Sequence, residues 1–161
     1  MTAGEATPRV LVAGIGNLFL GDDGFGPEVV RRLDPATMPA GVRVTDYGIR
    51  GMHLAYDLLA GYDALVLVDA LPGEPAGEVV VLAVGPDDFG QEEFDAHGMN
   101  PTAVLAGLRR IGGTLPPTYV VGCRAATVAE GIGLSPAVAA AVPRGVAAVL
   151  DLAVRLAPAG R

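Results

Sequence analysis

The chain has 161 residues, 51% of them hydrophobic, and a formal net charge of −7. This length fits one domain, residues 1–161 with an ordered core at about residues 9–156, and the hydrophobic content is enough for a buried core. All 11 basic residues are arginines, and they form no cluster larger than Arg31-Arg32 and Arg109-Arg110. These pairs are expected on solvated helix faces. Because the chain is acidic and has no larger basic cluster, we do not expect nucleic acid as a partner.

Cellular location is suggested by two further features. The first eight residues lack the apolar core of a signal peptide, and the longest apolar stretch, 146–157, is interrupted by Asp151 and Arg155. A single cysteine, Cys123, permits no internal disulfide, which fits a reducing compartment. We therefore expect a cytoplasmic protein with no membrane segment.

Short β-branched segments alternate with helical patterns, which is typical of a mainly parallel sheet covered by helices. In chain order we predict a strand at 9–13, a helix at 26–33, a strand at 42–46, a helix at 52–59, strands at 64–69 and 78–83, a helix at 100–110, a strand at 118–122 and a helix at 135–156. Residues 71–77 predict a turn-rich connection, and 84–99 a long acidic loop of the kind that is often functional. Ser135-Pro136 is typical of a helix start, and Pro143 is expected to kink or break that helix.

The loop from Gly14 to Gly26 reads Gly-Ile-Gly-Asn-Leu-Phe-Leu-Gly-Asp-Asp-Gly-Phe-Gly and follows the first predicted strand. A loop in this position is the usual ligand site of an open α/β sheet. A dinucleotide fingerprint would need glycine where Phe19 stands, and Asp22 and Asp23 carry the wrong charge for a phosphate. The chain also has no lysine for a phosphate-binding Walker loop. Two acids on a glycine loop suit a cation better, so no nucleotide cofactor is expected.

Missing residue types narrow the chemistry further. The single serine, Ser135, is assigned to a helix start, and lysine chemistry is impossible. Cys123 ends an apolar strand and is expected to be a buried small hydrophobe, although Arg124 beside it could lower its pKa and leave a thiol nucleophile open. Carboxylates, two histidines, tyrosines and a metal ion remain.

Asp23, Asp69 and His97 are expected to meet at the carboxyl edge of the sheet. Asp23 follows the first strand, Asp69 ends the third, and His97 lies in the long loop after the fourth. Two carboxylates and an imidazole suit zinc, nickel or a similar divalent ion. Taken singly, each acid could instead cap a turn and His97 could be an ordinary loop residue. Asp22 is expected to cap the following helix or face solvent.

A second histidine, His53, lies at the start of the predicted helix 52–59. This position favours an exposed residue over a metal ligand. His53 is therefore left out of the candidate site.

The chain resembles the hydrogenase maturation protease family over about residues 9 to 150. The resemblance rests on the loop 14–26 and on four later blocks: Asp-Tyr-Gly-Ile-Arg-Gly-Met at 46–52, Leu-Val-Asp-Ala at 67–70, His97, and Gly-Ile-Gly-Leu-Ser-Pro at 131–136. It implies an endopeptidase that removes a C-terminal extension from the precursor of a nickel-iron hydrogenase large subunit after nickel insertion. It also implies a three-layer α/β sandwich with a twisted, mainly parallel five-stranded sheet between helices, in which one strand can be reversed.

The resemblance places a catalytic and metal-binding trio on Asp23, Asp69 and His97. Asp23 stands where relatives often have glutamate, and Cys123-Arg124-Ala125 stands where many have Cys-Glu-Pro. The metal is expected to be nickel supplied by the precursor, engaged by a monomeric protease. We hypothesise that this ion polarises the scissile carbonyl or activates a water, with one aspartate as base. A non-cleaving nickel-binding docking protein and a different metal-dependent hydrolase are the alternatives.

Overall fold

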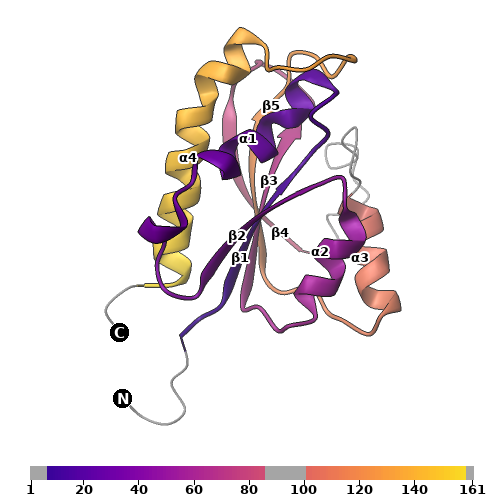
Figure 1. Ribbon diagram of the computed structural model, residues 1–161, viewed down its shortest axis with the longest axis vertical. Coiled ribbons are helices and arrows are strands. Elements are labelled where there is room, and N and C mark those ends of the chain that lie inside the picture. Colours follow the sequence, from indigo (N-terminus) through magenta and orange to yellow (C-terminus); the bar gives the residue numbers. More distant parts are fainter. Residues whose placement is uncertain (1–6, 86–100, 159–161) are drawn as a thin grey trace.

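The computed structural model of the protein describes residues 7–85 and 101–158 (Figure 1). Its strands are β1 (Val10–Ile15), β2 (Val42–Gly48), β3 (Ala64–Leu71), β4 (Val79–Val84) and β5 (Thr118–Arg124). Its α-helices are α1 (Phe25–Arg32), α2 (Gly51–Leu58), α3 (Pro101–Arg110) and α4 (Pro136–Leu156), and two short 3-10 helices are η1 (Gly21–Gly24) and η2 (Pro35–Thr37). Every predicted strand and helix is confirmed, with its ends within two residues.

The strands form one sheet in the order β2-β1-β3-β5-β4. β1 pairs in parallel with β2 and β3, and β3 pairs in parallel with β5. β4 is the exception, because it runs antiparallel to β5 at the edge of the sheet. The prediction of a mainly parallel five-stranded sheet with room for one reversed strand is confirmed.

Helices cover both faces of the sheet, as Figure 1 shows, with α1 and α4 on one side and α2 and α3 on the other. The strand residues alternate between the two faces. Val10 and Val12 of β1 pack with α1 and α4, whereas Leu11, Ala13 and Ile15 pack in the cluster that contains α2 residues. Burial on both faces explains why β1 and β3 are continuously apolar in sequence except for Asp69. Apolar packing therefore does not explain why an aspartate stands at position 69.

The last helix, α4, is continuous from Pro136 to Leu156, so the predicted break at Pro143 is wrong. Pro143 lies on the exposed side of the helix, while Val138, Val142 and Val149 on either side of it are fully buried. Burying such side chains contributes about 1.5–3 kcal/mol each, which outweighs a proline cost of about 3 kcal/mol. Among the residues described, α4 alone has the length and hydropathy of a membrane span, and one face of it packs on the sheet.

Candidate active site

Two glycines allow η1 and the start of α1 to lie directly against the carboxyl ends of β1 and β3. A Cβ on Gly26 would lie 2.2 Å from the backbone oxygen of Val68 and 2.4 Å from that of Ile15. At Gly16, where φ is +144°, a Cβ would lie 1.9 Å from the backbone oxygen of Asp23. Only residues without a side chain permit these approaches. The glycine spacing noted in the sequence therefore brings η1, and Asp23 with it, against the end of β3.

The carboxylates of Asp23 and Asp69 meet at this edge. Both side chains are buried, with exposed fractions of 1% and 4%. Asp23 Oδ2 accepts a hydrogen bond from the backbone N–H of Asn17 at 2.7 Å, and Asp69 Oδ1 accepts one from the N–H of Ala70 at 2.8 Å. Asp69 shares the alternation of Leu65, Leu67 and Leu71, so its side chain leaves β3 on the face covered by α2 and α3.

Burial raises the pKa of Asp69 well above its ordinary value, and the negative charge of Asp23 raises it further, against a smaller lowering by the Ala70 N–H. Two neighbouring acids in a buried site cannot both carry a full negative charge without a compensating cation or proton. The pair can therefore hold a proton when the site lacks a cation, and it offers hard oxygen ligands when a divalent ion arrives.

Asp22 has a different task from the one predicted. It is completely buried, and its carboxylate accepts hydrogen bonds from the backbone N–H groups of Ala126 (2.8 Å), Thr127 (3.2 Å) and Ser135 (2.7 Å) and from the Ser135 hydroxyl (2.8 Å). It neither caps α1 nor faces solvent, so both expectations are wrong. Because its partners lie more than 100 residues further along the chain, no local pattern could reveal them.

The carboxylate of Asp22 thus ties η1 to the segment between β5 and α4. Ser135 does stand at the N-cap of α4, but its hydroxyl donates to Asp22 and accepts no hydrogen bond from the backbone N–H groups of the helix. The sequence signal that marks this connection is Gly-Ile-Gly-Leu-Ser-Pro at 131–136, one of the blocks that carried the resemblance.

The thiol of Cys123 is excluded as a nucleophile by its surroundings. It is fully buried among the residues packed under α4, and burial, together with the charge of Asp22, raises its pKa to about 11. Arg124, the next residue of the strand, directs its guanidinium to the carbonyl oxygen of Pro72 at 2.7 Å. The expectation of a buried small hydrophobe is confirmed, and the expectation that Arg124 could activate the thiol is wrong.

The structure describes only one of the two histidines. His53 is exposed on α2, as predicted. His97 lies outside the described residues, so its position relative to Asp23 and Asp69 stays a prediction. Within 7–85 and 101–158 no group of three or more potential metal ligands is found, so the trio as a metal site stays a prediction.

Comparison with known proteins points to one family. The family profile described as "Hydrogenase maturation protease" matches residues 27–152. The chain is 32% identical over 136 residues to the hydrogenase expression/formation protein HupD of Rhodobacter capsulatus, covering 81% of this chain and 64% of that protein. It is 28% identical over 138 residues to the hydrogenase 2 maturation protease of Escherichia coli, covering 83% and 84% of the two chains.

The fold agrees with these sequence matches. The solved structure of the hydrogenase maturating endopeptidase HybD from E. coli superposes with a TM-score of 0.76 at 29% identity, covering 91% of this chain and 92% of that one. Fold and relatives together define the class of this protein as a hydrolase of the endopeptidase type. The chain belongs to the hydrogenase maturation protease family.

Proposed function

We propose that this protein removes the C-terminal extension from the nickel-loaded precursor of a nickel-iron hydrogenase large subunit. The observation that carries the proposal is the burial of Asp23 and Asp69 side by side at the carboxyl edge of the sheet. The pair lies where ligands bind in open α/β sheets, in a chain of the hydrogenase maturation protease family. Partner and substrate are then the same molecule, engaged by a cytoplasmic monomer.

The donor set fits a divalent ion carried by the substrate. Two carboxylates supply hard oxygen ligands, and His97, from the segment before α3, would supply a nitrogen. A divalent ion at this place supplies Lewis acidity that polarises a peptide carbonyl. A precursor that contains nickel gains ligand bonds from these residues that an empty precursor cannot form, so binding discriminates between the two.

The residues of this chain then have separate tasks. Asp69, whose pKa is raised by burial, holds a proton at its carboxyl group before the substrate binds and releases it when positive charge arrives. Once deprotonated, either carboxylate can accept a proton from an attacking water, which is the general-base role. Asp23 is held in place by the N–H of Asn17 and contributes its charge.

A cleavage assay tests the proposal. Nickel-loaded and nickel-free precursor are incubated with the protein, and mass spectrometry follows the released C-terminal peptide. Only the loaded precursor is expected to be cut, and Asp23→Asn, Asp69→Asn and His97→Ala are each expected to reduce cleavage strongly. Asp151→Asn, an exposed aspartate on α4, is the matched control and should cleave normally.

Two results would contradict the proposal. Binding of the loaded precursor without any cleavage would assign the protein as a nickel-binding docking protein. Wild-type cleavage by the Asp23, Asp69 and His97 variants would remove the trio from the mechanism.

A further inference from the structure

A groove of about 430 Å³ lies against η1 on the side of α1 and the segment that precedes α4. Gly21 and Gly24, which flank Asp22 and Asp23, both line it. The short helix η1 therefore lies between the groove and the proposed active site. Its larger lining side chains fall into an apolar set and a charged set. The apolar set is Leu18, Phe19, Ile132 and Leu134, and the charged set is Glu28, Arg31 and Arg32.

Three of the four side chains of the apolar set are exposed. Ile132, Phe19 and Leu18 have exposed fractions of 79%, 63% and 45%. They come from two segments far apart in the chain but gather beside one groove. Neighbouring exposed apolar side chains of this kind mark interaction sites.

The two segments that present these side chains are held together by the backbone. The N–H of Gly131 donates to the carbonyl oxygen of Phe19 at 2.8 Å, and the N–H of Gly21 donates to the carbonyl oxygen of Gly131 at 2.9 Å. The four hydrogen bonds to the carboxylate of Asp22 fasten the same two segments. The groove is therefore built before a partner arrives, which reduces the entropy cost of binding.

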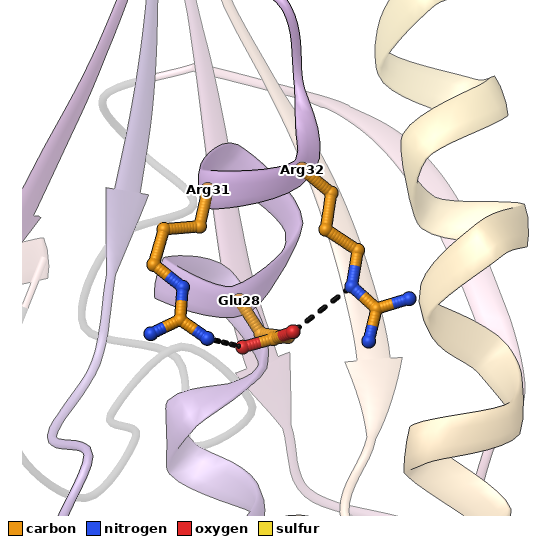
Figure 2. A network of polar contacts seen from close by, with 3 residues as sticks. All are labelled: Glu28, Arg31 and Arg32. Atoms are coloured by element: carbon orange, nitrogen blue, oxygen red, sulfur yellow. Dashed lines mark hydrogen bonds and ion pairs between the residues drawn. The ribbon is translucent and has the colours of Figure 1, made fainter.

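The charged set gives the groove a sign opposite to that of the protein. Two arginines and one glutamate leave a local charge of +1 on a chain whose net charge is −7. Figure 2 shows the guanidinium groups of Arg31 and Arg32 reaching from α1 to the two oxygens of Glu28. A guanidinium carries five N–H donors, more than one contact with Glu28 uses, so both arginines can donate to a second carboxylate.

We propose that this groove binds the end of the precursor's C-terminal extension, with an apolar side chain against Phe19 and Ile132 and the free α-carboxylate at Arg31 and Arg32. The inference rests on the proposed function, because a protease that removes a C-terminal extension acts on a segment that ends in a free α-carboxylate. Specificity for a chain terminus would then come from a place that takes no part in the chemistry. An internal acidic segment of the precursor would lack this anchor.

Binding of a synthetic peptide tests the groove without any cleavage step. The probe is a synthetic peptide of the precursor's C-terminal extension, labelled with a fluorophore at its N-terminus and prepared as the free acid and as the C-terminal amide. Fluorescence anisotropy should show the acid binding about fivefold more tightly than the amide, the scale of an exposed ion pair. In the double variant Arg31→Gln/Arg32→Gln, this difference should disappear.

Variants of the apolar set separate the two halves of the groove. Phe19→Ser and Ile132→Ser should weaken acid and amide alike by about fivefold or more. Arg155→Gln, an exposed arginine paired with Asp151 on α4, and Val154→Ser, an exposed apolar residue of the same helix, are the matched controls and should bind both peptides normally. Thermal unfolding of every variant checks that the fold is retained, since all these side chains are exposed.

Several outcomes would overturn the inference while leaving the proposed function intact. They are equal binding of acid and amide, no binding of either peptide, and normal binding by Ile132→Ser in a protein that still cuts the loaded precursor. Self-association that is lost in Ile132→Ser would assign the groove to a second copy of this chain. If the peptide binds as expected but the loaded precursor is never cut, the groove stands and the proposed function fails.

Discussion

Substituting Gly26 by alanine should damage both the fold and the proposed site, although glycine has no chemistry of its own. The added Cβ would lie 2.2 Å from the Val68 oxygen and 2.4 Å from the Ile15 oxygen. An ordinary carbon–oxygen contact is about 3.3 Å or longer, so the approach is short by about 1 Å. Both contacts are with backbone atoms of the central strands, which cannot rotate away as a side chain can. The start of α1, with η1 and Asp23, must therefore move away from β3.

The size of the effect follows from two opposing terms. Overpacking a close contact costs about 1–3 kcal/mol, whereas alanine in place of glycine in a helix stabilises by about 1 kcal/mol. Because both contacts are with backbone atoms, the overpacking cost lies in the upper part of that range. We therefore expect a net loss of about 1–2 kcal/mol in the free energy of unfolding, which lowers Tm by about 2–8 °C for a protein of this size. Because Asp23 moves relative to Asp69, processing should fall further, by up to about 100-fold for a 1 Å displacement.

Urea unfolding and the cleavage assay measure the two effects. Gly107→Ala is the matched control, because it is also a helical glycine but its Cβ would meet only the flexible side chain of Met52. That variant should be as stable as the wild type or more so, with normal processing. A Gly26→Ala protein with unchanged or increased stability would refute the close packing of α1 against β1 and β3.

Three further predictions concern single side chains. In metal-free protein, the free energy of unfolding should fall as pH rises from the ordinary carboxyl pKa through the raised pKa of Asp69, because the folded state binds more protons than the unfolded state in that range. Asp69→Asn should remove this fall, as measured by urea unfolding between pH 4 and pH 8. An unchanged pH profile in the variant would contradict the prediction. Asp22→Ala should lower the free energy of unfolding by about 2–4 kcal/mol, because it leaves four hydrogen-bond donors without their acceptor. Ser135→Ala should lower it by about 1 kcal/mol, because it removes only one of these donors. Equal effects of the two substitutions would show that Asp22 is not the centre of this hydrogen-bond network. Cys123 is buried and its pKa is raised to about 11, so it should resist iodoacetamide at pH 8 in the native protein and react once the protein is unfolded in urea. Rapid labelling of the native protein would refute the burial of this thiol.

Much of the fold could be predicted from the sequence because its elements carry local signals. Apolar strands bounded by glycine and proline, and helices with a serine-proline start, lie within two residues of their predicted ends. The exception is Pro143, where burial of the flanking residues outweighs a local preference. Asp23 and Asp69 could be proposed as candidate site residues because a charged residue late in an apolar strand, or in the loop that follows one, is not explained by packing.

The sequence by itself determined the succession of strands and helices along the chain, and it predicted two acids at one edge of the sheet. Only the tertiary structure decided the separate tasks of the adjacent aspartates. Asp22 and Asp23 are neighbours of the same chemical type, and nothing local distinguishes them. Their roles differ because the segment before α4 folds back and supplies donors to Asp22, while glycine contacts bring Asp23 against Asp69. Contacts between residues far apart in the chain leave no periodic trace in a sequence, and such contacts distinguish the two carboxylates.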